Sequence, residues 1–333
     1  MLSVENLRVE FDTRRGVAKV LDGVNFSVEP GETLGIVGES GCGKSMLALA
    51  IMGLVPSPPG RITGGDIKLH GESLPSMSAQ RRRQMRGNEI SMIFQEPMTS
   101  LNPVYTVGHQ IAETVRLHKR LSRREASDFA VEMIQAVGIP APSRRAREYP
   151  HQLSGGMRQR IMIGMALVCE PMVLIADEPT TALDVTVQAQ VFDLLKGLQE
   201  KTNTAVILIT HDMGVIAEMT DRVVVMYAGR VAEDGKTRNL LTEPKHPYSH
   251  GLINCVPHLQ AAPSGARRRL MEIPGIVPPL TDLGRGCAFA PRCPKAIDIC
   301  LEQSPPLAGG THRQACWLAP QCHAEAQNAP SSQ

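Results

Sequence analysis

Residues 38–45 read Gly38-Glu39-Ser40-Gly41-Cys42-Gly43-Lys44-Ser45, which matches the phosphate-loop (P-loop) pattern G-x-x-x-x-G-K-S. The apolar run from Thr33 to Val37 precedes this loop and predicts a short strand. Lys44 to Met52 predicts a helix that ends at Gly53. A glycine-rich turn between a buried strand and a helix is the setting that the pattern requires. The stretch therefore predicts an α/β nucleotide-binding fold.

The residue types of this loop suit a phosphate ligand. Its glycines let the backbone turn tightly, so that successive N–H groups point at phosphate oxygens. The positive end of the following helix adds to the attraction. We expect Lys44 to reach the β- and γ-phosphates of ATP and the Ser45 hydroxyl to ligate Mg²⁺. All eight residues are predicted to bind the nucleotide, although Cys42 occupies a variable position and is given no chemistry of its own.

A second motif supplies two carboxylates. The apolar run Met172 to Ala176 predicts a buried strand, and Asp177 and Glu178 follow it directly. Acids at this point lie at the carboxyl edge of a parallel sheet, where open α/β sheets bind their ligands. Asp177 fits the Mg²⁺ shell, and Glu178 is placed to polarise the attacking water. The pair is weak evidence alone and strong evidence beside a P-loop.

Bulk properties narrow the class of protein. The chain has 333 residues, of which 42% are hydrophobic and 20% are charged, and a length of this order suits roughly two domains. A net charge of +2 gives no global field that would indicate nucleic acid as the partner. The chain shows no signal-peptide pattern and no apolar stretch of roughly 18 to 20 residues. We expect a cytoplasmic protein that is held at a membrane only through partners.

The order of the predicted elements indicates a core with an insertion. Strands are predicted at Leu2 to Phe11, Val17 to Val28, Ile90 to Phe94, Ala205 to Thr210 and Arg222 to Met226. Helical periodicity covers Val107 to Leu117 and Arg123 to Val137, which predicts a helical subdomain inserted at about residues 96–165. After about residue 245 prolines and cysteines become frequent, and Ala324 to Gln333 is predicted to be disordered.

A third motif, residues 153–160, gives the family. Leu153-Ser154-Gly155-Gly156-Met157-Arg158-Gln159-Arg160 resembles the signature of ABC transporter ATPases, although position 157 often holds Gln there. A serine and two glycines that open a helix offer a hydroxyl, bare N–H groups and a positive dipole end to an anion. The resemblance extends in order to Gln95 as the Q-loop glutamine, Ala182-Leu183-Asp184 as the D-loop and His211 as the switch histidine.

The resemblance implies a role for each of these residues. Gln95, Glu178 and His211 would be catalytic, and Gln95 would also reach Mg²⁺ with Ser45 and Asp177. Ser154, Gly155, Gly156 and Asp184 would bind the nucleotide. The residue that stacks on adenine is left open between Phe11, Arg14 and Arg15.

The resemblance also implies the architecture. The expected fold is α/β, an ABC cassette with a RecA-like core, an N-terminal antiparallel β subdomain, the inserted helical subdomain and a Cys- and Pro-rich C-terminal extension. Residues 1–245 would form the ATPase domain and residues 246–333 the extension. Two cassettes would form a head-to-tail dimer in which each ATP lies between one P-loop and the other subunit's signature. Gln95 and the helical segment after it would contact the membrane subunits.

Two further segments indicate the subfamily. Residues 94–103, which run from Phe94 to Pro103, look like the oligopeptide and dipeptide importer group, as does the later Glu243-Pro244-Lys245-His246-Pro247-Tyr248. The implied protein powers peptide uptake as a peripheral subunit at the cytoplasmic face of the membrane. Its partners would be two transmembrane permeases, a second homologous ATPase (or a second copy) and a substrate-binding protein that acts through the permeases, with no nucleic acid.

Two other functions stay open. The same architecture could import another solute, such as a nickel complex or glutathione. A soluble ABC ATPase acting on translation or DNA is the alternative from a different class, but such proteins usually have two cassettes or a long coiled-coil insertion, and neither is visible in this sequence.

The cysteines gather near the C-terminus. Five of the eight lie beyond residue 286, in the pattern Cys287-x5-Cys293-x6-Cys300-x15-Cys316 with Cys322 after it. Structural zinc sites usually use closely spaced Cys pairs, which this pattern lacks, whereas four thiolates are also the ligand set of a [4Fe–4S] cluster. The peptide-importer group carries such a cluster in this region, so the resemblance implies that Cys287, Cys293, Cys300 and Cys316 bind one. Zinc and free thiols remain the alternatives.

Overall fold

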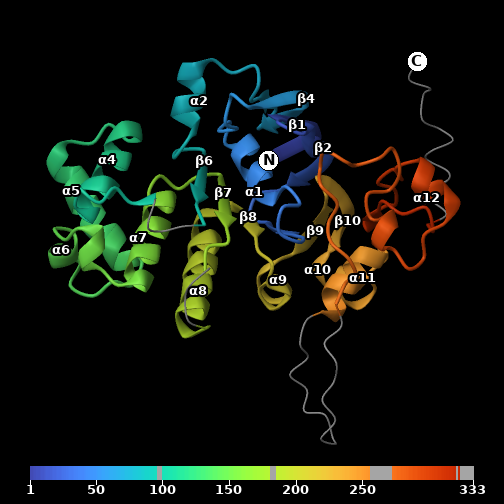
Figure 1. Ribbon diagram of the computed structural model, residues 1–333. Helices are drawn as coiled ribbons and strands as arrows, with labels where there is room; N and C mark the ends of the chain where they lie inside the picture. The colour runs from blue at the N-terminus through green and yellow to red at the C-terminus, as the bar shows by residue number, and fades with distance from the viewer. Residues whose placement is uncertain (96–99, 181–184, 256–271, 320–321, 323–333) are drawn as a thin grey trace, which may run out of the picture.

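Two β-sheets, a separate group of helices and a C-terminal extension make up the molecule (Figure 1). The computed structural model describes residues 1–333 apart from 96–99, 181–184, 256–271, 320–321 and 323–333. The predicted disorder of Ala324 to Gln333 and the expected D-loop Asp184 lie outside the described residues. The α/β class and the antiparallel N-terminal β subdomain expected from the sequence are confirmed.

The N-terminal sheet is antiparallel. Within the described residues it has four strands in the order β2-β1-β4-β5, and they are β1 (Leu2–Thr13), β2 (Gly16–Val28), β4 (Gly60–Leu69) and β5 (Glu72–Ser73). The β1–β2 hairpin was predicted. The strand β4 was not, because Gly64 and Gly65 interrupt its apolar alternation and its burial is patchy.

The second sheet carries the P-loop. Its strand order in the described part of the chain is β11-β10-β9-β3-β8-β7-β6, and β3 pairs in parallel with both β8 and β9. The strands are β3 (Thr33–Val37), β6 (Ile90–Ile93), β7 (Val173–Asp177), β8 (Ala205–Ile209), β9 (Arg222–Tyr227), β10 (Arg230–Lys236) and β11 (Arg313–Gln314). Every residue of β3, β7 and β8 is buried, which is why these strands are continuous apolar runs.

Two strands end one residue earlier than the sequence predicted. The last pairs join Ile93 to Ala176 and Asp177 to Ile209. Phe94 and Thr210 therefore lie just beyond the paired part of β6 and β8. Gln95 and His211, which follow them, lie outside the sheet.

The helices fall into three places in Figure 1. The first helices in the chain are α1 (Lys44–Ile51), which follows β3, and α2 (Ala79–Met85), which follows β5. The helical group comprises α4 (Val107–His118), α5 (Arg123–Ala136), α6 (Pro142–Arg145) and α7 (Gly155–Leu167), with the short 3₁₀ turn η1 (Pro150–Gln152). The remaining helices are α8 (Val185–Thr202), α9 (Met213–Met219), α10 (Thr237–Thr242), α11 (Pro247–Asn254) and α12 (Asp298–Glu302), with the 3₁₀ turn η2 (Ala290–Arg292).

The helical group forms because its apolar positions recur at helical spacing. Ile111, Val115, Ile134 and Ile161 are fully buried in one cluster that joins α4, α5 and α7. Ser122 caps α5 in a reciprocal capping box with Glu125. The predicted helical insertion is confirmed, and the group extends from one side of the large sheet (Figure 1).

The C-terminal extension is docked on the cassette core. Its strand β11 pairs with β10, and the fully buried Glu233 on β10 accepts hydrogen bonds from the backbone N–H groups of Lys245 and His246. His312 Nε2 lies 2.6 Å from Glu233 Oε1. Since a carboxylate is buried only when it is well paired, these contacts hold the extension firmly against β10.

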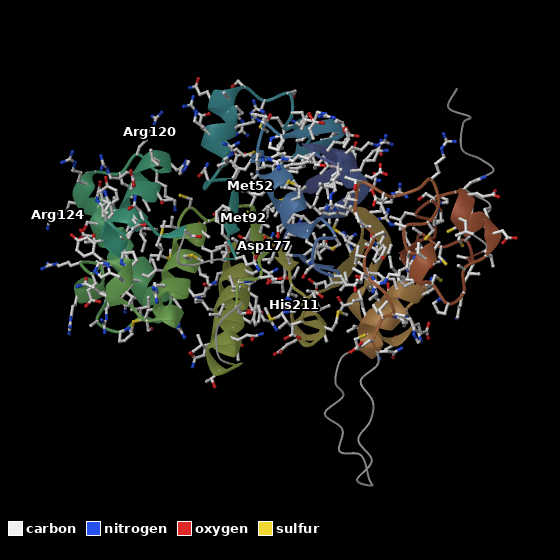
Figure 2. All side chains as sticks on the ribbon, viewed as in Figure 1. Met52, Met92, Arg120, Arg124, Asp177 and His211 are labelled. Carbon is white, nitrogen blue, oxygen red and sulfur yellow. The ribbon has the colours of Figure 1, made fainter. Side chains whose placement is uncertain are left out.

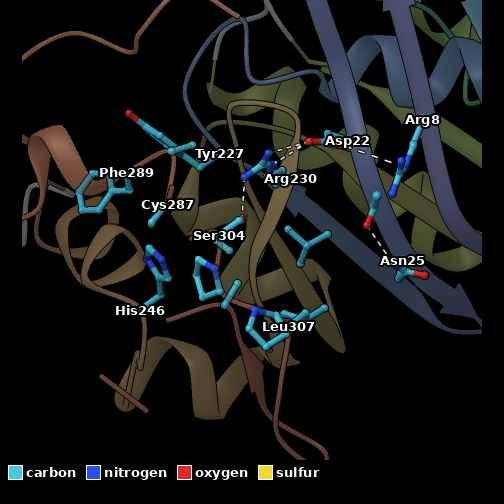
Figure 3. A pocket seen from close by; sticks show the side chains of 17 residues that line it. Arg8, Asp22, Asn25, Tyr227, Arg230, His246, Cys287, Phe289, Ser304 and Leu307 are labelled. Carbon is cyan, nitrogen blue, oxygen red and sulfur yellow. Dashed lines mark hydrogen bonds and ion pairs between the residues drawn. The ribbon is translucent and has the colours of Figure 1, made fainter. Parts of the chain in front are cut away.

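A cavity of about 310 Å³ lies between the extension and the N-terminal sheet (Figure 3). Arg230 crosses its wall, where the guanidinium donates to Asp22 at 2.7 Å and to Ser304 at 2.7 Å. The extension is thus tied to β2 as well as to β10.

Among the described residues no helix is long and apolar enough to cross a membrane.

Candidate functional site

The P-loop connects the central strand β3 to α1. Gly38, Gly41 and Gly43 have φ angles of +154°, +79° and +101°. A Cβ at Gly38 would collide with the Met226 carbonyl, and one at Gly43 would lie 2.7 Å from the Val20 carbonyl oxygen. Only glycine therefore fits at these two positions, and the loop can turn its N–H groups towards one centre.

Lys44 is held across the loop. Its side chain is buried, and Nζ donates to the carbonyl oxygens of Gly38 at 2.7 Å and Glu39 at 3.1 Å. These contacts fix the ammonium group at the mouth of the loop. The Cys42 thiol is buried in the hydrophobic core, and this burial raises its pKa. The backbone of Cys42 is therefore the part of this residue that remains for a ligand.

Asp177 and Ser45 form the part of the site that suits Mg²⁺. Asp177 ends β7 and is 4% exposed, and its pKa is raised mainly by burial, against a hydrogen bond from Ser45. Its Oδ1 atom is buried without a hydrogen-bond partner among the described residues. A carboxylate oxygen with free lone pairs beside a serine hydroxyl is the ligand chemistry that Mg²⁺ prefers, so these residues fit the ion.

Glu178 is held between two of the predicted catalytic residues. The Gln95 side-chain amide donates to Oε2 at 3.0 Å, and His211 Nδ1 lies 3.1 Å from Oε1. Glu178 adopts a φ of +46°, which is uncommon for a residue with a side chain, and its N–H donates to the Ile209 carbonyl at 2.9 Å. Strained backbone of this kind gathers at functional sites.

The geometry brings together residues from three strand ends. Gln95 follows β6, Glu178 follows β7 and His211 follows β8, since parallel strands finish at the same edge. Figure 2 places Asp177 and His211 at the centre of the molecule. His211 also faces a cavity of about 550 Å³ that the P-loop residues Gly38 to Ser40 line. A cavity of this size accommodates a nucleotide.

The signature residues lie at the start of α7. Ser154 caps this helix and accepts a hydrogen bond from the Met157 N–H at 3.3 Å. Ser154 and Gly155 are exposed, so the helix N-terminus is open to a ligand or a second chain. Gln159, buried on the same helix, donates to the Pro179 carbonyl and so ties α7 to the segment after Glu178. Asp184 lies outside the described residues.

The three candidates for adenine stacking differ in their surroundings. Phe11, on β1, packs against the hydrophobic core, and its ring closely approaches Gly60. Arg14 and Arg15 lie exposed in the turn between β1 and β2. The choice between the three residues stays a prediction.

The four cysteines predicted to bind an iron–sulfur cluster lie near one another but are not grouped as metal ligands in the described part of the chain. Cys287, Cys293, Cys300 and Cys316 line one small cavity in the extension, and burial raises the pKa of Cys316 to about 11. Burial also raises the thiol pKa values of Cys287 and Cys293. In the part of the chain that the structure describes, no three His, Cys, Asp or Glu side chains are grouped to hold a metal ion. The four thiols share a cavity, and burial favours the protonated form of Cys287, Cys293 and Cys316 over a ligating thiolate.

The sequence did not reveal that the extension reaches the P-loop. The Tyr248 hydroxyl accepts a hydrogen bond from the Glu39 N–H at 2.8 Å, and Arg292 pairs with the Glu39 carboxylate. Tyr248 ends the segment 243–248, which resembles the peptide-importer group, so the sequence did single out this residue. Arg292 lies 253 residues from its partner, and no local pattern connects the two.

Comparison with known proteins agrees with this geometry. Residues 21–181 match the ABC transporter family model, and residues 232–300 match the C-terminal region of oligopeptide/dipeptide transporters. The chain is 51% identical over 319 residues to a Sinorhizobium fredii protein named as a probable peptide ABC transporter ATP-binding protein, with 95% of this chain and 94% of that protein covered. It is 50% identical over 313 residues to the oligopeptide transport ATP-binding protein AppD of Bacillus subtilis, with 94% of each covered.

A solved structure gives the same result for the fold. The dimeric ATP-binding cassette MJ0796, bound to ADP and Pi, superposes with a TM-score of 0.65 at 28% identity, covering 72% of this chain and 99% of that one. The P-loop, the Asp177–Glu178 pair and these matches together show that the chain belongs to the ABC transporter family, among ATPases with the oligopeptide/dipeptide-type C-terminal region.

Proposed function

We propose that this ABC ATPase powers the uptake of di- and oligopeptides across the cytoplasmic membrane. The observation that carries its chemistry is the position of Glu178, which is held by Gln95 and His211 directly after the buried Asp177. A carboxylate whose two oxygens are both held at the carboxyl edge of the sheet is suited to activate water.

Each residue of the site has its own role in ATP binding or hydrolysis. Lys44 and the loop amides bind the β- and γ-phosphates, while Asp177 and Ser45 would hold Mg²⁺, which would neutralise phosphate charge. Glu178 accepts a proton from the attacking water, and His211 and Gln95 keep its carboxylate aimed at that water. Ser154, Gly155 and Gly156 of a second ATPase subunit close the site from the other side, and the part of Asp184 in nucleotide binding stays a prediction.

The cargo and the partners are inferred from the relatives. Their names specify peptide transport, and residues 232–300 match the C-terminal region of that group. The partners are two transmembrane permeases, a second ATPase subunit (homologous, or another copy) and a substrate-binding protein, with the chain at the cytoplasmic face of the membrane. Residues 1–245 act as the ATPase domain, and residues 246–333 form the extension that distinguishes this group.

Peptide uptake is tested with the assembled transporter. The complex is purified from detergent-solubilised membranes, reconstituted into proteoliposomes and supplied with labelled di- and oligopeptides. ATP-dependent accumulation that is lost in the Glu178→Gln variant supports the proposal. Uptake of a nickel complex or glutathione instead of peptide rejects the cargo, and recovery of the chain with ribosomes rather than permeases rejects transport.

We also propose that the four cysteines of the extension bind a [4Fe–4S] cluster. The support is the set of four thiols around one cavity, which would have to draw together and lose their protons to ligate iron. Anaerobic purification followed by iron and sulfide analysis tests this. About four irons per chain, lost when Cys293 and Cys316 are changed to serine, supports it, whereas stoichiometric zinc or metal-free thiols reject it.

A further inference from the structure

Glu39 is the point at which the C-terminal extension contacts the P-loop. Its carbonyl accepts from Lys44 Nζ at 3.1 Å, and its N–H donates to the Tyr248 hydroxyl at 2.8 Å. Its carboxylate accepts two hydrogen bonds from Arg292, at 2.6 Å from Nη1 and 3.0 Å from Nη2. One loop residue is therefore held by the P-loop lysine on one side and by two residues of the extension on the other.

Arg292 is built into the extension as a fixed group. Its side chain is only 4% exposed, and Nε donates to the Pro274 carbonyl at 2.8 Å. The guanidinium also donates to the Ile273 carbonyl at 3.2 Å and the Tyr227 hydroxyl at 3.3 Å. Since a planar guanidinium held on every side cannot rotate, its paired contact fixes the Glu39 carboxylate in one place.

The charge of Glu39 makes this contact relevant to the nucleotide. Glu39 is a loop residue, and it lines the same cavity as Gly38, Ser40 and His211. A free carboxylate at this position would repel an incoming triphosphate, because like charges in a partly buried site are poorly screened. Arg292 neutralises that carboxylate and draws it towards the extension. The Tyr248 hydroxyl restrains the backbone of the same residue.

We propose that Arg292 is a positioning residue for ATP binding, which acts through Glu39 to hold and neutralise the P-loop from the C-terminal extension. This inference rests on the proposed function only in taking the P-loop as the ATP site. The extension then has a direct role in nucleotide affinity. The P-loop is complete only when the extension is docked.

The test compares Arg292→Ala with a matched control. Arg313→Ala removes another arginine of the extension, one that pairs with Asp234 on β10. We expect Arg292→Ala to raise the Kd for Mg-ATP of the full-length chain about tenfold, the size of a lost charge-assisted pair, and Arg313→Ala to leave it unchanged. In the assembled transporter Arg292→Ala should raise the KM for ATP in the same proportion with kcat nearly unchanged, because Glu178 and its partners are untouched.

A double-mutant cycle shows whether Arg292 acts through Glu39. Glu39→Gln removes the ion pair and the repulsive charge together, so its Kd should rise less than that of Arg292→Ala. In the Glu39→Gln background Arg292→Ala should add less than about twofold, because its partner is already gone. An equal tenfold loss in both backgrounds, or a wild-type Kd in folded Arg292→Ala, overturns the proposal.

The conservative variant covers the case in which Arg292→Ala fails to fold, as judged by circular dichroism. Arg292→Lys keeps the charge but cannot make the paired contact, so its Kd should rise above that of the wild type by less than about tenfold. Wild-type affinity in both Arg292→Lys and Glu39→Gln overturns the inference. A transporter that hydrolyses ATP normally but imports no peptide would reject the cargo proposal and leave this inference intact.

Discussion

His211 Nδ1 lies 3.1 Å from Glu178 Oε1, across the ends of two neighbouring parallel strands. The His211 side chain is 70% exposed, whereas that of Glu178 is 16% exposed. The contact therefore joins a group open to solvent and ligand to a carboxylate that is largely shielded. Movement of the loop after β8 would change what the Glu178 carboxylate faces.

Glu178→Gln is expected to bind Mg-ATP with near wild-type affinity and to lose roughly 10²–10⁴-fold in hydrolysis, since an amide cannot accept the proton of water. ATP titration and phosphate release by the assembled transporter measure the two effects. Glu170→Gln, at an exposed carboxylate that pairs with Lys119, is the matched control. Wild-type turnover in Glu178→Gln would show that another group is the base.

His211→Ala is expected to lower kcat by about 10- to 100-fold, because the Glu178 carboxylate loses the His211 contact that helps to orient it. The affinity for Mg-ATP should change little, since the P-loop and Asp177 are intact. His250→Ala, at an exposed position on α11, is the control for loss of an imidazole. An unchanged kcat in His211→Ala would leave the histidine with no part in hydrolysis.

Asp177→Asn is expected to raise the stability of the metal-free protein and to weaken Mg²⁺ binding. Burial raises the pKa of Asp177, so its contribution to stability is present below the unfolded pKa and is lost as the pH rises through the folded pKa. At neutral pH the metal-free variant should be more stable by on the order of 1 kcal/mol, because it no longer buries an unpaired charge.

Thermal unfolding at several pH values, with and without Mg-ATP, checks this. Mg-ATP should stabilise the wild type and have little effect on Asp177→Asn. The exposed Asp193→Asn on α8 should behave as wild type in both conditions. A variant that is less stable than wild type without metal would contradict the assigned cost of burying Asp177.

Glu233→Gln is expected to destabilise the chain by about 3 kcal/mol, since it breaks a fully buried charged network between β10 and the extension. Denaturant unfolding measures the loss, and protease sensitivity of the extension shows whether its docking is the weakened part. Glu218→Gln, an exposed glutamate on α9, should change the free energy of unfolding by less than about 0.5 kcal/mol. Equal effects in the two variants would rule out a special role for Glu233.

Much of the nucleotide site could be predicted because its chemistry is local in the sequence. The loop glycines, Lys44 and Asp177 each follow a short apolar strand, and parallel strands bring such ends together. The meeting of Gln95, Glu178 and His211 follows from the same rule. The strands that they follow were predicted, whereas the order of these strands in the sheet and the left-handed backbone of Glu178 were not.

The extension was much harder to predict. Arg292 and Glu39 are far apart in sequence, and neither lies in a periodic segment that would indicate a partner. Strand β11 is only two residues long, which is too short for any alternation to show. The cysteine spacing indicated four ligands converging on one centre. The structure places the four thiols around one small cavity that Phe289 and Trp317 also line.

The pairing of β11 with β10 has a consequence for the solubility of shortened chains. Residues Arg313 and Gln314 cover part of the outer edge of the large sheet, where Asp234 and Glu233 would otherwise present open backbone groups. An uncovered strand edge is a template for pairing with another molecule. A fragment cut at the end of the ATPase domain would therefore be prone to aggregate through β10, even if every residue that touches ATP were retained.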